Sequence, residues 1–188
     1  KTETKVDSVD FRTWDLTTLF EEVSLHFDAS LQNTKGLQKI KTSSFKAILH
    51  QQKGSEIYRP TLYDLLAHTA LQFYKTSENN ITRPADKFEI DDPNMLCMGR
   101  DFVDLPIDTT NKTSLQSKAL QLYQDLLKFH KNDAKPNAFA EVDLERLQFV
   151  YTNATFTNKN TPYLKTLENS SKKYDNNAVS GLYQHQVA

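Results

Sequence analysis

Two long stretches of helical periodicity, separated by only a few residues, constrain the fold of this chain most. The first covers residues 114–131, and the second runs from Ala138 to Val150 with apolar residues again three and four apart. A polar turn that ends near Pro136 joins them. Because the connection is short, the two helices should pack antiparallel as a hairpin.

Further helical stretches lie on both sides of this pair. They cover residues 15–32, 61–76 and 161–174, and the stretch from Ala178 towards the end of the chain. Asp15 is placed to cap the first, and Pro60 precedes the second, where a proline loses no hydrogen bond. Between Leu37 and Leu49 the pattern is weaker and typical of a short helix and a turn.

This succession of hairpins predicts an all-α fold, with the hairpins stacked in an α-solenoid. Leu122 and Leu164 hold comparable positions in successive hairpins about forty residues apart, close to the period of tetratricopeptide (TPR) repeats. The TPR consensus around a Trp-x-x-Leu-Gly-x-x-Tyr motif is absent. We therefore predict a TPR-like arrangement rather than a true repeat.

Three regions follow from these patterns. Residues 1–14 form a polar lead-in, 15–113 a helical subdomain, and 114–188 the TPR-like hairpins, which are cut short at the C-terminus. Within the second region, residues 77–113 hold three prolines among acidic and apolar residues, which predicts an irregular segment packed on the helices. Because the chain starts at Lys1 rather than Met, we expect it to be a piece of a longer polypeptide.

Charge excludes some partners. The 23 Lys and Arg nearly balance the 24 Asp and Glu, so the net charge of -1 produces no overall field that would attract nucleic acid or an anionic membrane. No run of about 18 or more apolar residues is present, so we expect no membrane insertion by this chain. Another protein, or a neighbouring domain, is the expected partner.

The histidines form no recognised metal-binding pattern. The nearest acidic neighbours are Asp28 for His26 and Asp133 for His130, and each pair would need further, distant ligands to hold a metal. We interpret the histidines as surface or helix-end residues, with His130 favouring the helix dipole at a helix C-terminus. The full set is His26, His50, His68, His130 and His185.

An acidic cluster within residues 86–92 is the main candidate for cation binding or for paired-carboxylate acid–base chemistry. It consists of Asp86, Glu89, Asp91 and Asp92. No Asp-x-Asp-x-Asp-Gly loop accompanies it, so a solvated or helix-capping stretch is the favoured interpretation.

A second charged group lies in a predicted helix. Glu141, Asp143, Glu145 and Arg146 alternate there with leucines, which predicts charge pairing along the helix or with a neighbour rather than catalysis. The aromatic residues, Trp14 included, mostly follow helical spacing and are expected in the core.

The single cysteine, Cys97, lies between Leu96 and Met98 and is expected to be buried and inert. One thiol leaves both a reducing and an oxidising compartment open. Gly-rich phosphate loops, Gly-x-Ser-x-Gly and other nucleophile motifs are absent. We therefore predict no catalytic, cofactor-binding or metal-binding residues, and no enzyme.

Three stretches nevertheless resemble a known family. They are YRPTLYDLLAH over 58–68, ITRPADKFEID over 81–91, and the segment from SLQ at 114–116 to DLERL at 143–147. Together they resemble the helical N-terminal region of large bacterial proteins of the alpha-2-macroglobulin family. The resemblance spans roughly residues 58–150, and the remainder matches in helical character only.

The resemblance implies a parent protein in the bacterial cell envelope, periplasmic or anchored to the outer membrane, often as a lipoprotein, that traps or inhibits proteases. In that family the helical region precedes β-sandwich domains, and the trapping machinery lies elsewhere. The family's thioester motif is absent, since Met98 and Gly99 follow Cys97 where Glu-Gln would be required. No functional residue of the family carries over to this chain.

The leading hypothesis is therefore a non-catalytic helical scaffold or protein-interaction module of such an envelope protein. One alternative is an independent helical module that binds a peptide or protein, which would require a groove with exposed aromatic or Arg residues. Another is a metal-binding protein or enzyme that uses the acidic segment 86–92.

Overall fold

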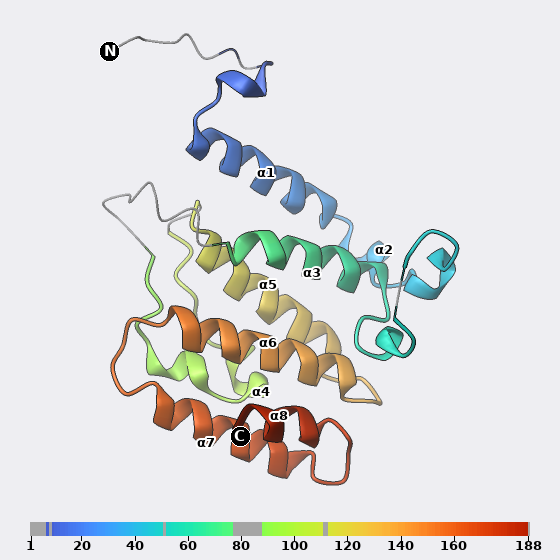
Figure 1. Cartoon of the computed structure of the whole chain (residues 1–188), viewed down its shortest axis with the longest axis vertical. Coiled ribbons are helices and arrows are strands. Elements are labelled where there is room, and N and C mark those ends of the chain that lie inside the picture. The colour runs from blue at the N-terminus through green and yellow to red at the C-terminus, as the bar shows by residue number, and fades with distance from the viewer. Residues whose placement is uncertain (1–6, 8, 51, 77–87, 111–112, 188) are drawn as a thin grey trace.

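Helices make up most of the part of the chain that the structure, a computed structural model, describes (Figure 1). The described residues are 7, 9–50, 52–76, 88–110 and 113–187. Within them there are eight α-helices, and extended pairing is limited to an isolated bridge between Lys41 and Thr61. The predicted all-α class is confirmed.

The long helices fall close to the predicted ranges. The α-helices are α1 Leu16–Ser30, α2 Thr34–Leu37, α3 Leu62–Tyr74, α4 Gly99–Phe102, α5 Leu115–His130, α6 Asn137–Asn153, α7 Asn160–Lys173 and α8 Ser180–Val187. Short 3₁₀ helices cover η1 Phe11–Thr13, η2 Thr42–Phe45, η3 Ser55–Ile57 and η5 Pro93–Leu96.

Side-chain caps explain where three of these helices begin. Asp15 accepts a hydrogen bond from the backbone N–H of Thr18 at the start of α1, as predicted, and Ser114 accepts one from Ser117 at the start of α5. At α3, Thr61 and Asp64 satisfy each other's backbone N–H groups as a capping box.

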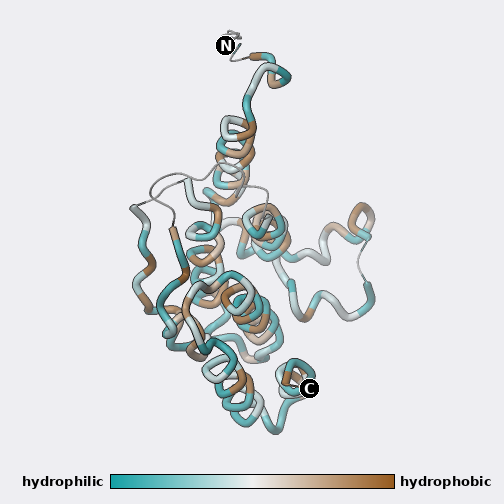
Figure 2. Tube along the Cα trace, turned by 60° about the vertical axis from the view of Figure 1, so that its left-hand side comes forward, coloured by the Kyte–Doolittle hydropathy of each residue, from teal (hydrophilic) through white to brown (hydrophobic). Residues whose placement is uncertain are grey.

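The helices follow one another down the long axis of the molecule, from α1 near the N-terminus to α7 and α8 at the other end (Figure 1). Helix α3 packs on α1 and on α5, and α6 packs on α5, on α7 and on α8. Consecutive helices α5 and α6 lie side by side, as their short connection predicts, and so do α7 and α8. The buried residues are mostly apolar and form one core cluster. Hydrophobic and hydrophilic positions alternate along the helices (Figure 2), as expected where one face of each helix is buried.

Helix α1 lies on the surface of this stack. Ser24 is its one buried residue, and its contact with α3 is aromatic, with Phe20 and Phe27 both stacked on Phe73 at 5.4 Å between ring centroids. Lys118 of α5 donates hydrogen bonds to Ser24 and Asp28 at 2.7 and 2.6 Å. These polar contacts hold α1 in place.

Residues 88–110 thread across α5, α6 and α7, with η5 and α4 as their regular turns. Side chains of the long helices satisfy carbonyl groups along this irregular segment. Gln124 of α5 donates to the carbonyls of Phe102 and Leu105 at 2.9 and 2.8 Å, and Thr166 of α7 donates to that of Leu96 at 2.6 Å. This part of the predicted irregular segment is a packed connection, because its backbone groups need partners once they are buried.

Candidate functional site

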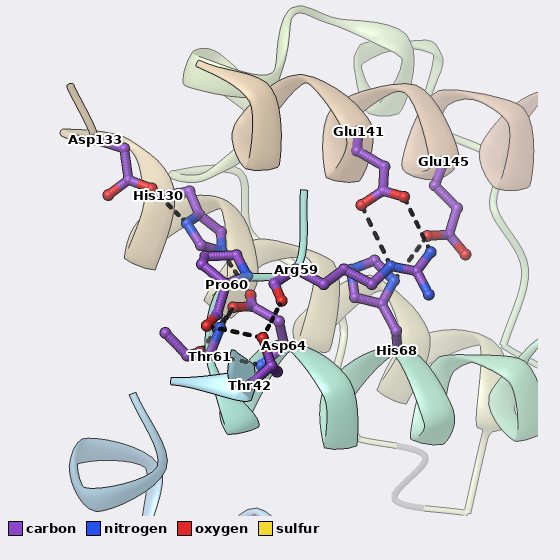
Figure 3. Close-up of polar contacts among 10 residues, drawn as sticks. All are labelled: Thr42, Arg59, Pro60, Thr61, Asp64, His68, His130, Asp133, Glu141 and Glu145. Carbon is purple, nitrogen blue, oxygen red and sulfur yellow. Dashed lines mark hydrogen bonds and ion pairs between the residues drawn. The ribbon is translucent and has the colours of Figure 1, made fainter. Parts of the chain in front are cut away.

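His130, the last residue of α5, lies between two carboxylates (Figure 3). Its Nε2 is 2.7 Å from Oδ1 of Asp64 on α3, and its Nδ1 is 2.7 Å from Oδ2 of Asp133 in the following turn. The imidazole is only 1% exposed. The structure thus places His130 at a helix end, as predicted, but buries it, and it adds Asp64 to the predicted neighbour Asp133.

The two carboxylates control the charge of this imidazole. Burial by itself lowers the pKa of His130, whereas its hydrogen bonds to Asp64 and Asp133 and their negative charges raise it. The carboxylates prevail, so the pKa of His130 is raised above its ordinary value. The ring, whose protonated form these carboxylates favour, therefore joins the end of α5 to the start of α3.

The same Asp64 ties α3 to the segment before it. Its Oδ2 accepts hydrogen bonds from the N–H and the hydroxyl of Thr61, at 2.8 and 2.7 Å. Thr42 in turn donates its hydroxyl to the carbonyl of Pro60 at 3.1 Å (Figure 3). The Thr61 hydroxyl is directed at Asp64 rather than at His130, so these residues do not form a nucleophile–base pair.

A second set of polar contacts joins α3 to α6, about one and three turns beyond Asp64. Glu145 of α6 approaches His68, with 3.1 Å between Oε2 and Nδ1, and forms a very short ion pair with Lys75. Arg59 pairs with Glu141 at 3.1 Å (Figure 3). The predicted pairing of the α6 acids with a neighbouring helix is what the geometry shows.

Glu145 is held in its charged form. Burial raises its pKa, but His68 and Lys75 lower it more, and the pKa of Glu145 falls from 4.5 to about 2. His68 is 3% exposed in the middle of α3, so the interpretation of His68 as a surface or helix-end residue was wrong. The partly buried carboxylate of Glu145 is the polar group closest to this ring in the contact between α3 and α6.

Several polar atoms at these contacts have no hydrogen-bond partner among the described residues. They are both ring nitrogens of His68, the hydroxyl of Tyr123 and Oε2 of Glu145. The contact between His68 and Glu145 is thus electrostatic, because its atoms are close but out of line for a hydrogen bond. His68 and Tyr123 are buried, so their acid–base groups face neighbouring helices rather than solvent.

Arg146 forms the third joint and is completely buried. Its guanidinium donates to the carbonyls of Met95 and Cys97 at 2.7 and 2.9 Å and makes a very short contact with Asp143 one turn earlier. It also lies over the ring of Phe102, 4.6 Å from the centroid. This one side chain fastens the irregular segment to α6.

Asp143 extends this joint to α8. Its Oδ2 accepts a hydrogen bond from the Tyr183 hydroxyl at 3.1 Å, and burial together with Asp143 raises the pKa of Tyr183. The buried pair of Asp143 and Arg146 is therefore structural, since each member is surrounded by donors or acceptors of the protein itself.

The remaining sequence candidates do not converge. His26 lies 3.4 Å from Glu22, not Asp28, and is 78% exposed, and His50 and His185 are exposed. Asp92 caps η5, accepting from the N–H of Asn94 at 2.8 Å. Glu89 and Asp91 are exposed, and Asp86 lies outside the described residues. Across the described ranges, the structure shows no group of three or more His, Cys, Asp or Glu that could hold a metal ion.

Cys97 is half-buried, so it is less buried than the sequence predicted. Burial raises its pKa to about 11, against the lowering effect of Arg146. The thiol is therefore protonated at neutral pH, which makes it a weak nucleophile.

A hollow of about 610 Å³ opens where α6, α7 and α8 meet. Tyr151 and Tyr163 stack in its wall at 4.4 Å between centroids, and Tyr151 donates to Asn160 at 2.8 Å. Its lining carries no charged side chain: Gln148, Tyr151, Thr152, Asn160, Tyr163, Leu164 and Gln186. The tyrosine and amide groups offer apolar faces together with hydrogen-bond donors and acceptors.

Sequence reasoning missed the hollow, Asp64 and Tyr183. The spacing of Thr61 and Asp64 is a capping-box pattern and could have identified this aspartate as a structural residue. No local signal marks Tyr183, because its partner Asp143 is forty residues away. No local signal marks the hollow either, because its lining comes from three different helices.

No helix in the described part of the chain is long and apolar enough to cross a membrane. In comparisons with known proteins, no family model, no curated protein and no solved structure matches this chain.

Proposed function

We propose that this chain is a non-catalytic helical scaffold and protein-interaction module. Its hairpins α5–α6 and α7–α8 would stack as in a TPR-like solenoid. Its parent would be a large bacterial envelope protein of the alpha-2-macroglobulin type, periplasmic or outer-membrane-anchored, that traps or inhibits proteases. The sequence resemblance over residues 58–150 supports the parent, and the helical architecture supports the module.

The observation that carries the interaction role is the hollow at the junction of α6, α7 and α8. Amide side chains such as Gln148 and Asn160 can pair with a peptide backbone, and Leu164, 40% exposed, offers an apolar contact. By contrast, the charged residues that could have served chemistry, Glu145, Arg146 and His130, are occupied by joints between helices.

A site-specific crosslink tests this role. A photo-crosslinking phenylalanine analogue replaces Thr152, which lines the hollow, and in a matched variant replaces Glu168, which is exposed on α7 outside it. Both variants are irradiated with the envelope fraction of the source cells, and the crosslinked peptides are sequenced. We expect a polypeptide adduct from position 152 and none from 168. Equal adducts at both positions, or none at 152, would contradict the proposal.

The identity of the adduct separates the two binding hypotheses. Peptides from further domains of the parent chain support the scaffold, whereas peptides from a separate protein support the independent binding module. The uncharged lining of the hollow is compatible with both.

A further inference from the structure

A projecting segment that begins within α2 and ends shortly before α3 carries an unusual charge. The described residues 35–50 and 52–57, which we term the lysine lobe, contain five lysines, one glutamate, no arginine and no aspartate, although the whole chain has a net charge of -1. The lysines are Lys35, Lys39, Lys41, Lys46 and Lys53. Net charge therefore conceals a local positive field, which acts on partners within about a Debye length.

These charges are available to a partner. All five lysines are exposed, and none forms an ion pair with the described residues, in contrast to Lys75, Lys118 and Lys131 on the helical body. The lobe's one acid, Glu56, accepts a hydrogen bond from the N–H of Gly54 within the lobe.

Exposed isoleucines lie among the lysines. Ile48 is 80% exposed, and Ile57 and Ile40 are 45% and 40% exposed. Most of the Ile48 side chain is in contact with water, so its apolar surface is available to a partner.

The lobe has a fixed base and a protruding tip. Leu62 donates its N–H to the carbonyl of Ile40 at 2.8 Å, and Thr42 donates its N–H to that of Pro60 at 3.0 Å. These bonds attach the lobe to the start of α3. In Figures 1 and 2 this part of the chain extends sideways from the helical stack.

We infer that the lysine lobe docks the chain on the surface of an anionic lipid bilayer. The lysines lie over the lipid phosphates, and Ile48 enters the headgroup region, with no helix crossing the membrane. The use of lysine instead of arginine favours a lipid bilayer as the partner. Attraction to a bilayer surface depends on the number of positive charges, whereas binding a carboxylate or phosphate on a protein favours the bidentate hydrogen bonds of arginine.

Co-sedimentation with lipid vesicles tests the inference. The whole chain is mixed with vesicles of phosphatidylcholine alone, or of phosphatidylcholine with phosphatidylglycerol, and the bound fraction is measured at low and high salt. We expect binding to the anionic vesicles only, weakened by salt. Each lysine contributes about fivefold, so Lys46→Gln with Lys53→Gln should weaken binding about 25-fold.

Two further variants separate charge from apolar contact and from general charge loss. Ile48→Ser should weaken binding several-fold at unchanged charge. The matched control, Lys165→Gln with Lys172→Gln, removes two exposed lysines from α7 and should leave binding unchanged. Melting temperatures verify that every variant is folded.

Three outcomes would overturn the inference. The first is equal binding to neutral and anionic vesicles. The second is a loss of vesicle binding in the α7 control as large as that in the lobe variant. The third is that the chain binds soluble polyglutamate but neither kind of vesicle. The last result would assign the lobe to an acidic protein instead.

Discussion

Gly99 packs its backbone directly against the carboxylate of Asp143, so closely that a Cβ at position 99 would lie 2.6 Å from Oδ1. This contact lets α4 approach α6 where Arg146 and Tyr183 also meet Asp143. Glycine at this position is thus a requirement of packing, not of backbone conformation.

Gly99→Ala should destabilise the protein by about 1–3 kcal/mol, because the added methyl group must displace a buried, fully engaged carboxylate. Thermal or urea unfolding measures the change. Gly181→Ala is the matched control, since nothing lies within 4 Å of a Cβ there, and it should be neutral or slightly stabilising. If both variants changed the free energy of unfolding by the same amount, the Asp143 carboxylate would move aside for the added methyl group without a measurable cost.

Arg146→Lys should cost about 3–5 kcal/mol, because one ammonium cannot reproduce the contacts with Met95, Cys97 and Asp143. Labelling of the Cys97 thiol should become faster as the segment detaches. Exposed Arg100→Lys serves as the control. Unchanged labelling in Arg146→Lys would mean that other contacts hold the segment.

His130 should make stability depend on pH in the neutral range. Its folded pKa lies above the ordinary value of 6.5, so the charged ring stabilises the fold fully below about pH 6.5, and this contribution is lost as pH rises through the folded pKa. The gap in melting temperature between wild type and His130→Gln should therefore narrow as the pH rises above about 6.5 and through the raised pKa of His130. A constant gap would show that folding does not shift the pKa of His130.

The contribution of Glu145 to stability should be lost as the pH falls, whereas that of His130 is lost as the pH rises. Its pKa falls from 4.5 unfolded to about 2 folded, so its contribution is present above about pH 4.5 and is lost as pH falls towards 2. Glu145→Gln should be less stable than wild type at neutral pH and should approach it in acid. Glu168→Gln, at an exposed site on α7, should follow wild type throughout.

Calcium or zinc should leave the melting temperature unchanged, because a bound ion would stabilise the folded state by mass action. Metal analysis of the purified protein complements this measurement. A rise in melting temperature with either ion, abolished by Asp91→Asn with Asp92→Asn, would instead support the alternative of a metal site in segment 86–92.

The helices themselves were predictable because their signals are local. Asp15 begins α1 and Ser114 begins α5 through hydrogen bonds to residues three positions later. For His68, the sequence predicted the helical position but not the burial of the side chain. Its place on α3 was evident, but its burial depends on Glu145, which comes from a helix nearly eighty residues further along the chain.

The sequence by itself determined the all-α class and the positions of the long helices, since apolar periodicity and caps act within a few residues. Only the tertiary structure decided which charges meet. His130 with Asp64, Glu145 with Lys75, and Arg146 with the carbonyls of the irregular segment are pairs that packing creates. A buried charge must find its partner wherever the fold supplies one, and that partner is seldom a neighbour in sequence.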